Sequence, residues 1–568
     1  MILREFKHLN KNIKMKNIQL RIGLVLIVAV VLLSAFKLYD DGDDFELAKS
    51  FDLFHDVVRE IRLYYVDNVD APKLIGEATK ELLKKLDPYT VFYPENQIED
   101  YKLMTTGAYG GIGAGIYDKK QTLLVSDIIK NSPADSSGLK IGDEITAVNG
   151  IRITKNNISE IRKNLKGEPG STIDLTIKRY GVDNVIQKNI VRKKIISPII
   201  PFAKVLNGNL GYIKLSSFRA NAANEFKKKL KNLNSEKKLS GIIIDLRENP
   251  GGLLNEAAEI VNLFVPKGSE IVSTKGRVKS WNHVYKAKRD PLFPDLPIIV
   301  LINNHSASAS EIVSGALQDL DRAVIIGQRS FGKGLVQVTR KTEYNTRIKI
   351  TTAKYYIPSG RCIQAIDYSH RNPDGSVGKI PDSLISEFKT LNNRKVYDGG
   401  GIEPDVYLSQ DTLSKFTEDL IQNFEIFDFC TKYFYEHPRI SSVNNFSLTD
   451  FDYKTFTEYI ENDKRSFQSE AELVARKLAV TAEKEHYEKA IIFKIKELQN
   501  ELNLDKYRAL TQFKTEIIPI LEREIIKRYY FEEGTICEEM KFDKPLKQAK
   551  ILLFDKEKYQ KILSGIND

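Results

Sequence analysis

Residues 306–311 read Ser-Ala-Ser-Ala-Ser-Glu, and they follow an apolar run, Ile298–Ile302. A helical pattern begins directly afterwards, at residues 312–320. This order predicts a strand, a tight turn and a helix, a geometry that exposes a small nucleophile at a helix N-terminus. A second segment, 331–334, reads Phe-Gly-Lys-Gly and places Lys333 between two glycines that do not crowd it. A serine and a lysine so placed indicate a hydrolase with a serine nucleophile and a lysine base.

The two segments resemble those of the carboxyl-terminal processing (tail-specific) peptidases, a family of Ser/Lys serine proteases with a PDZ domain. In that family the catalytic lysine follows the serine by 25 residues, and 333 − 308 = 25. The resemblance therefore implies that Ser308 is the nucleophile and Lys333 the base. Ser306 and Ser310 are then expected to be turn and first-turn residues whose hydroxyls cap backbone N–H groups.

Lys333 can take the proton of the serine only when its amine is neutral. A lysine has a pKa near ~10.4, so a working value of ~7–8 needs a shift of about 3 units. Burial away from carboxylates lowers the pKa, whereas a nearby anion raises it. We therefore expect Lys333 to be buried and to have no carboxylate in contact with its amine.

Two further positions match the site of the family. A strand pattern at residues 335–339 places Lys333 and Gln337 on one face. The resemblance implies that the Gln337 amide holds the lysine without adding charge. Asp319, eleven residues after Ser308, matches a position sometimes counted with the triad. It is the weaker candidate, because an ionised aspartate touching Lys333 would keep the lysine protonated.

A glycine pair is the candidate oxyanion site. Residues 241–247 have the pattern of a buried strand, and Asn249-Pro250-Gly251-Gly252 follows before another helix. Glycines let backbone N–H groups approach a substrate carbonyl closely. The resemblance implies that the oxyanion hole is formed at Gly251 and Gly252 and by the N–H of Ala309. Taken alone, the segment also fits a plain strand–turn–helix connection.

A glycine-rich segment opens a smaller domain. It leads into a short strand at residues 114–117, and Asn149-Gly150 marks a hairpin turn. The region 105–192 looks like a PDZ domain, which binds a free C-terminus as an added strand and holds its carboxylate at the glycine loop. The residues expected to bind substrate tails are Tyr109, Gly110, Gly111, Ile112 and Gly113. A scaffold PDZ domain with an empty or blocked groove is the alternative.

A nucleotide-binding reading of the lysine segment fails. Residues 327–334 fit most of the phosphate-binding pattern G-x-x-x-x-G-K-[ST]. However, Gly334 has no hydroxyl for magnesium, and residues 335–344 alternate like a strand where a P-loop must open a helix. We reject a nucleotide-binding function.

The N-terminus predicts export. Basic residues precede an apolar run of 15 residues, 22–36, and aspartates follow it. The run is shorter than the ~20 residues that span a bilayer comfortably, but it suits the core of an export signal. An uncleaved anchor in the inner membrane is the alternative. In both cases we expect the chain from Phe45 onward to lie in the periplasm or cell envelope of a bacterium.

The expected fold is α/β and multidomain. A helical N-terminal region, 45–104, matches a segment that often forms dimers in the family, so the resemblance implies a homodimer through these helices; a local helical brace is the alternative. A helical C-terminal extension would dock a partner, cover the active site or serve as a helical support. The expected parts are a signal or anchor with an acidic linker (1–44), the helical region (45–104), a PDZ domain built as a small β-barrel with helices (105–192), a mixed α/β, crotonase-like protease core (198–410) and the extension (411–568).

Composition limits the remaining classes. The net charge of +10 is modest for 568 residues, and the basic runs are short and lack interleaved aromatic residues, which argues against nucleic-acid binding. The three cysteines are widely separated and suggest neither a disulfide framework nor a metal cluster. The chemistry needs no cofactor and no metal.

Two function hypotheses follow. The first is an exported serine endopeptidase that selects protein or peptide substrates by their free C-termini and cleaves them through an acyl-enzyme. The second is a catalytically silent PDZ scaffold in the cell envelope. The presence of Ser308, Lys333 and Gln337 together favours the first. The sequence leaves open whether an adaptor is needed.

Overall fold

The computed structural model describes residues 41–98, 101, 105–119, 122–372, 376–409, 412–462, 470–502 and 506–565. The apolar run 22–36, predicted to be an export signal or anchor, lies outside these residues. Within the described ranges, no helix is long and apolar enough to cross a membrane. The chain divides into two compact units, residues 1–85 and 86–568, which we describe separately.

The first unit contains two helices, α2 (Asp41–Tyr64) and α3 (Ala71–Lys84). The Asp70 carboxylate caps α3 by accepting a hydrogen bond from the Lys73 N–H at 3.1 Å. Leu47, Phe51 and Phe54 share one face of α2 at helical spacing, and all three are exposed. The predicted helical region 45–104 is interrupted: α3 ends at Lys84, residues 91–93 join a sheet, and residues 98 and 101 are helical again. The break follows Asp87-Pro88, which disfavours helix.

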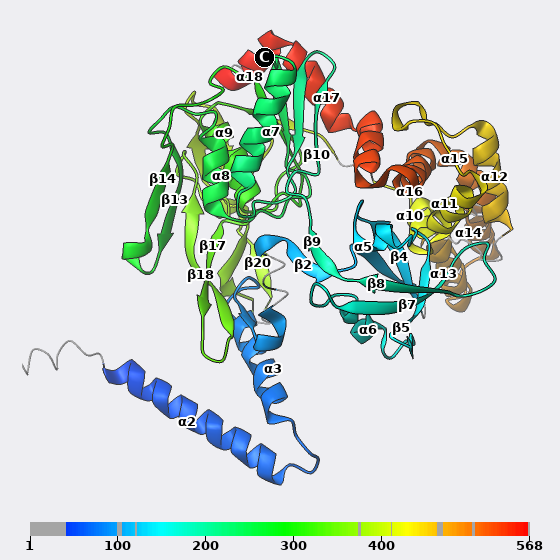
Figure 1. Ribbon diagram of the computed structural model, residues 1–568, viewed down its shortest axis with the longest axis horizontal. Coiled ribbons are helices and arrows are strands. Elements are labelled where there is room, and N and C mark those ends of the chain that lie inside the picture. Colours follow the sequence, from blue (N-terminus) through cyan, green and yellow to red (C-terminus); the bar gives the residue numbers. More distant parts are fainter. Residues whose placement is uncertain are drawn as a thin grey trace, which may run out of the picture. The chain divides into compact units, whose positions relative to one another are not determined.

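The second unit is centred on a six-stranded sheet with the order β10-β11-β12-β15-β16-β23. β10 is antiparallel to β11, and the remaining neighbours are parallel. Helices α7, α8 and α9 lie along one side of this sheet, and the C-terminal helices α17 and α18, drawn in red, lie along the other (Figure 1). The bounds are β10 (Phe202–Leu206), β11 (Leu210–Lys214), α7 (Ala222–Glu236), β12 (Gly241–Asp245), α8 (Leu254–Val261), β15 (Ile298–Ile302), α9 (Ala309–Asp319), β16 (Val324–Gly327), β23 (Val406–Tyr407), α17 (Lys544–Phe554) and α18 (Lys556–Ser564).

The central strands are apolar throughout because both faces of the sheet are covered. In β12, Ile242 and Ile244 pack under α7–α9, whereas Ile243 packs under the C-terminal helices. The period of two in a strand explains this alternation. The extension therefore completes the core of the sheet, and it is more than a solvated support.

A five-stranded antiparallel sheet lies next to it, in which β18 pairs with β1, β13 and β17. β1 comes from the residues just after the first unit, so this segment is part of the core. The bounds of its strands are β1 (Val91–Tyr93), β13 (Glu270–Gly276), β14 (His283–Lys286), β17 (Leu335–Lys341) and β18 (Arg347–Tyr356), and the short helices η1 (Glu95–Gln97) and η2 (Lys279–Trp281) lie between them in the chain. Two separate two-stranded sheets follow, β19 (Ile366–Arg371) with β20 (Val377–Lys379) and β21 (Glu387–Lys389) with β22 (Lys395–Tyr397), and η3 (Asp382–Leu384) lies between them in the chain.

A small barrel-like sheet forms a separate layer, with the order β3-β4-β5-β7-β8 and β6 paired to β5. β3 is an edge strand, and the Asn149-Gly150 turn connects β5 to β6 as expected. β2 pairs with β9 outside this sheet, beyond the expected boundary at residue 192. The bounds are β2 (Ala108–Gly111), β3 (Ala114–Lys119), β4 (Thr122–Ile128), α5 (Pro133–Ser136), β5 (Glu144–Val148), β6 (Ile151–Arg152), α6 (Ile158–Asn164), β7 (Thr172–Lys178), β8 (Ile186–Val191) and β9 (Lys193–Ile196).

The helical extension contacts this small barrel as well as the central sheet. Phe427 of α11 is buried in the barrel's own apolar core, and Asp428 pairs with Lys119 at 2.7 Å. Figure 1 shows α10–α16, in yellow to orange, beside the cyan strands of the barrel. The bounds are α10 (Lys415–Gln422), α11 (Glu425–Glu436), η4 (Val443–Asn445), α12 (Asp450–Glu461), α13 (Glu470–Lys484), α14 (Lys489–Leu502), α15 (Lys506–Gln512) and α16 (Lys514–Phe542). The mixed α/β multidomain fold predicted from the sequence is confirmed.

Candidate active site

Ser308 lies on the turn between β15 and α9, directly before the first helical residue. Its backbone has φ 55° and ψ −112°, a conformation that non-glycine residues rarely adopt. The surrounding structure holds it there, because its carbonyl accepts hydrogen bonds from the Ile312 N–H at 3.0 Å and the Tyr355 hydroxyl at 3.1 Å. The strained turn places the half-buried serine at the N-terminus of α9.

The two neighbouring serines are buried and have structural partners. The Ser306 hydroxyl donates to the Leu246 carbonyl at 2.8 Å, and the Ser310 hydroxyl donates to the Asn249 carbonyl at 2.9 Å. Both bonds connect the serine turn to the loop after β12. Of the three serines in the motif, Ser308 is the one that lines the adjacent cavity.

That cavity has a volume of about 680 Å³ and brings together residues far apart in the sequence. Ser308, Lys333 and Gln337 line it, together with Gly251 and Gly252. Apolar side chains including Leu253, Ile312 and Leu335 complete its wall. The cavity is large enough for a substrate backbone and several side chains.

Lys333 has the electrostatic properties that a lysine base needs. Its pKa is lowered from 10.5 to about 8, mainly by burial and secondly by the charge of Lys349. Glu311 and Asp87 oppose this shift, but they do not cancel it. The Nζ atom of Lys333 lies 4.2 Å from the centre of the Tyr89 ring, an aromatic face.

Tyr89 was not predicted as a site residue, although its motif, Leu86-Asp87-Pro88-Tyr89-Thr90, stands out in the sequence. The Asp87 carboxylate accepts from the N–H groups of Tyr89 and Thr90, both at 2.8 Å. The Thr90 hydroxyl oxygen in turn accepts from the Thr351 N–H of β18 at 3.2 Å. This loop therefore fixes the Tyr89 ring against the lysine.

Gln337 lies on β17 and lines the cavity with Lys333. Its Nε2 donates to the Thr351 hydroxyl at 3.2 Å, and the register of β17 shifts between Val336 and Gln337. In the described part of the chain, no hydrogen bond joins Gln337 to Lys333. The expected contact with the lysine amine stays a prediction.

Glu311 links the serine turn to the lysine loop. It is fully buried, and its Oε2 accepts from the Ser308 N–H at 2.7 Å and the Lys333 N–H at 2.9 Å. Its Oε1 accepts from the Ser330 hydroxyl at 2.6 Å and the Gly332 N–H at 2.7 Å. Burial raises the pKa of this carboxyl. A sequence signal for this role of Glu311 was present, because Ser308-x-x-Glu311 has the spacing of a capping box.

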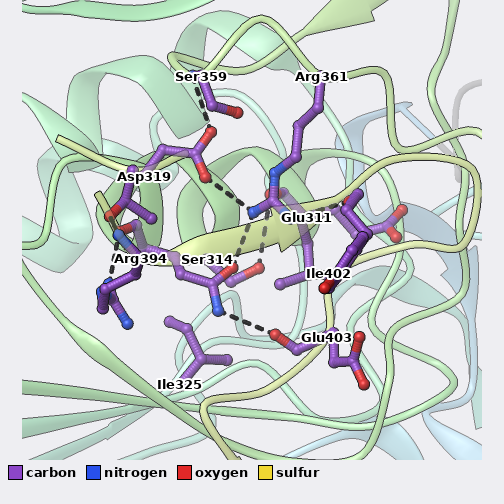
Figure 2. Close-up of polar contacts among 12 residues, drawn as sticks. Glu311, Ser314, Asp319, Ile325, Ser359, Arg361, Arg394, Ile402 and Glu403 are labelled. Carbon is purple, nitrogen blue, oxygen red and sulfur yellow. Dashed lines mark hydrogen bonds and ion pairs between the residues drawn. The ribbon is translucent and has the colours of Figure 1, made fainter. Parts of the chain in front are cut away.

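Asp319 has other partners. It is buried, and its carboxylate accepts from the Arg361 guanidinium at 2.8 Å and the Ser359 N–H at 3.0 Å (Figure 2). Arg361 also donates to the Gln318 side chain at 2.8 Å. Asp319 does not line the cavity that contains Ser308 and Lys333, as far as the described residues define it. The structure therefore gives Asp319 a role in holding the C-terminal end of α9.

The glycine loop lies against the serine turn. A Cβ atom on Gly251 would lie 2.8 Å from the Ser308 Cβ and 2.9 Å from the Ala309 nitrogen, and the φ of Gly251 is +100°. Only glycine fits such an approach. The Gly251 N–H donates to the Asn249 side chain at 2.9 Å. Among the described residues, the N–H groups of Gly252 and Ala309 have no hydrogen-bond partner, so these two are the available donors.

A second, smaller cavity of about 240 Å³ lies between β3 and α6 of the small barrel. Tyr109, Ile112 and Gly113, three of the five residues predicted to bind tails, line it, and their binding of a tail stays a prediction. Gly110 and Gly111 lie in β2, where they pair with β9. The cavity runs beside the unpaired edge of β3, which suits the addition of a strand.

Comparison with known proteins identifies three regions. The model of peptidase family S41 matches residues 209–377, and a PDZ domain model matches residues 124–179. The model described as "Probable PDZ-protease, C-terminal helical domain" matches residues 416–553, in the extension for which the sequence offered no motif.

The matches to curated relatives extend over most of the length of each relative. A carboxy-terminal-processing protease of Bartonella bacilliformis is 39% identical over 316 residues, which is 55% of this chain and 72% of the relative. The carboxy-terminal processing protease CtpA of Bacillus subtilis is 30% identical over 404 residues, 70% of this chain and 84% of the relative. The solved photosystem II D1 C-terminal processing protease is 23% identical, with a TM-score of 0.35 over 64% of this chain and 94% of its own.

The sequence relatives confirm the resemblance that the Ser308 and Lys333 segments carry. The extent and identity of these matches, together with the model that spans both segments, show that this chain belongs to the carboxy-terminal processing proteases of peptidase family S41.

Proposed function

We propose that this protein is an exported serine endopeptidase that recognises the C-terminal tails of protein substrates through its PDZ domain and cleaves peptide bonds with Ser308 and Lys333. The observation that carries the catalytic part is that Ser308, Lys333 and the glycine loop line one cavity. The lowered pKa of Lys333 supports its role, because a useful fraction of the amine is neutral near neutral pH.

The reaction proceeds by acylation and deacylation. The neutral Lys333 amine takes the proton of the Ser308 hydroxyl as its oxygen attacks the scissile carbonyl. The N–H groups of Gly252 and Ala309 donate to the oxyanion that forms. Lys333 then returns the proton to the leaving amine, which frees the first product. Lys333 then takes a proton from water as the water oxygen attacks the acyl carbonyl. The bond from that carbonyl to the Ser308 oxygen breaks, Lys333 returns the proton to this oxygen, and the second product leaves.

Gln337 and Glu311 act as positioning residues in this scheme. Glu311 holds the backbones of Ser308 and Lys333 at fixed positions by accepting from both. Gln337 adds a neutral amide to the wall of the same cavity, so it orients the lysine without stabilising the ammonium.

Tail recognition rests on the groove beside β3. A bound tail would extend the sheet at this edge, with its carboxylate at the glycine loop. Lys166 also lines this cavity and favours an anionic terminus. A scaffold would use the same groove without any cleavage.

Export, membrane anchoring and dimerisation belong to the same proposal. The basic and apolar N-terminal segment supports export to the cell envelope. The exposed apolar face of α2, with Leu47, Phe51 and Phe54, supports pairing with a second copy. A Phe51→Asp variant of the full chain should sediment as a smaller species than the parent if α2 forms the dimer.

The decisive experiment incubates the purified chain with an unfolded test protein and with paired peptides that end in a free apolar residue or in its amide. An endopeptidase that reads tails cuts the free form about tenfold to a hundredfold faster, because amidation removes the charge-assisted bonds to the carboxylate. A scaffold binds the free peptide and cuts nothing. Cleavage that persists in a Ser308→Ala variant would overturn the proposed nucleophile.

A further inference from the structure

The tail groove of the PDZ domain is crossed by one arginine side chain. Arg162 extends from α6 to β3, where its guanidinium donates to the Ile116 carbonyl at 3.1 Å and to the Asp118 carboxylate at 3.3 Å. Half of the Arg162 side chain is exposed, so it is not part of the barrel's core. The Ile116 carbonyl lies on the edge strand, where an added strand would form hydrogen bonds.

The position of Arg162 along the groove follows from strand geometry. A tail whose carboxylate lies at residues 111–113 has its last residue beside Ala114, at the start of β3. Two residues further back, its third-from-last residue lies beside Ile116. Side chains in a strand alternate, so the last and third-from-last side chains both point towards α6. The last one meets the apolar Ile112 and Leu165, and the third-from-last one meets Arg162.

The charged side chains that line the cavity have one sign, and Asp118, which pairs with Arg162, lies outside this lining. The cavity lining in the described structure contains two cations, Arg162 and Lys166, and no carboxylate. Lys166 lies at the loop end, with its Nζ 5.9 Å from the centre of the Tyr109 ring. Arg162 is therefore the cation that a side chain further along the tail would meet.

We propose that Arg162 determines the specificity of the tail groove: it must leave the Ile116 carbonyl when a tail binds, and it then pairs with an acidic side chain at the third-from-last residue of that tail. The inference rests on the proposed PDZ tail recognition and adds a substrate class to it. That class is protein tails with Asp or Glu at the third-from-last position and an apolar last residue. A tail with Lys or Arg at that position brings like charges together and is disfavoured.

The test uses the full chain carrying Ser308→Ala, so that peptides bind without being cleaved. Fluorescent peptides end in a free alanine and differ only in the third-from-last residue, which is Asp, Ala or Lys. Because the pair is half exposed, we expect Asp to bind about threefold to tenfold more tightly than Ala, and Lys more weakly than Ala. A peptide with Asp and an amidated end reports on carboxylate capture itself.

Variants at Arg162 distinguish selection from simple blocking. Arg162→Leu should make the Asp and Ala peptides bind equally, whereas Arg162→Lys should keep a reduced preference for Asp. Lys163→Leu is the matched control, because Lys163 follows Arg162 on α6, is exposed and does not line the cavity. Far-ultraviolet circular dichroism confirms that each variant is folded.

Two results would overturn the inference. If Arg162→Leu increases the affinity for all three peptides by the same factor, Arg162 only blocks the groove. If the free and amidated Asp peptides bind equally, the domain does not read carboxylates, and the proposed tail recognition fails with it. If free peptides bind more tightly than amidated ones but the third-from-last residue has no effect on affinity, only the role of Arg162 is overturned and tail recognition stands.

Discussion

The ammonium nitrogen of Lys333 lies 4.2 Å from the centre of the Tyr89 ring, although 244 residues separate them in the chain (333 − 89 = 244). The ring reaches the lysine because Asp87 and Thr90 fix its loop on β18. It covers the amine with an aromatic face in place of water. Its π face also attracts the ammonium, which favours a higher pKa. Desolvation is the largest cause of the lowered pKa of Lys333, so we expect the exclusion of water by the ring to outweigh this attraction.

We expect the cleavage rate to rise with pH through about 8, where the Lys333 ammonium of the folded protein loses its proton. Tyr89→Ala admits water to the amine, so the midpoint of this rise should move upward by about one pH unit. Tyr89→Phe keeps the ring and should leave the midpoint unchanged. The measurement is kcat/KM against pH for the three proteins. A midpoint that does not move in Tyr89→Ala would exclude the ring as a cause of the shift.

Lys333 should reduce the stability of the folded protein while enabling its chemistry. Its pKa is about 8 when folded and near 10.5 when unfolded, so the unfolded state binds more protons between these values. The free energy of unfolding should therefore increase from pH 8 to 10.5. Lys333→Met removes this penalty and should stabilise the protein at pH 7 by up to about 3 kcal/mol.

Lys333→Met and Lys333→Arg should both be inactive, because arginine keeps its proton above pH ~12. Urea unfolding at pH 7 and 10 measures the stability effect in the parent and in Lys333→Met. A Met variant that is less stable than the parent at pH 7 would contradict the desolvation argument.

Ser308→Ala should abolish cleavage without a large change in stability, since the hydroxyl is the attacking group and lines an open cavity. Ser306→Ala should behave differently. It removes the bond to the Leu246 carbonyl and leaves the Asn303 N–H without its acceptor, so it should destabilise the fold by about 1–3 kcal/mol while keeping activity at low temperature. Active-site labelling with a serine-reactive fluorophosphonate measures the activity of both variants, and thermal melting measures their stability. Labelling of Ser308→Ala at the parental level would show that another serine is the nucleophile.

Glu311→Gln should reduce kcat by roughly a hundredfold or more. An amide cannot accept from all four donors: its NH₂ group would face the N–H of Gly332 in one orientation and the N–H groups of Ser308 and Lys333 in the other. A loss of about 3 kcal/mol of positioning corresponds to that factor. Glu403→Gln is the control, because Glu403 is an exposed glutamate that pairs only with Arg329 at 3.0 Å among the described residues. Equal activity in the two variants would remove Glu311 from the site.

The sequence predicts the parts of the site that lie on continuous segments. Ile298–Ile302 and the residues after it become β15 and α9 as expected, because apolar periodicity and the small-residue turn specify them locally. The role of Tyr89 could not be read in this way, because it depends on how a distant loop packs on β18. For Asp319 the sequence suggested a role that the fold does not support. Its spacing fits a catalytic position, but its partner is Arg361, which only the fold brings near.

The helical extension was the least predictable part, since amphipathic helices do not reveal which surface they cover. The structure shows that Tyr559 of α18 both donates to the Ile298 carbonyl at 3.1 Å and accepts from the Ile298 N–H at 2.9 Å. Ile298 is the first residue of β15, the strand that leads to Ser308. The extension therefore provides hydrogen bonds to the backbone of the central sheet as well as apolar cover.

Tyr559→Phe should accordingly destabilise the protein by about 1–3 kcal/mol, because it leaves the buried Ile298 N–H without its acceptor. Its kcat at low temperature should stay near the parental value, since Tyr559 does not line the described cavity. Tyr507→Phe is the matched control, because the Tyr507 side chain is 66% exposed.

A chain ending at residue 410 should not fold, because Ile243, Ile299 and Leu301 would lose their cover. Differential scanning calorimetry and solubility after expression measure these effects. A soluble, cooperatively melting chain that ends at residue 410 would show that the sheet does not need the extension.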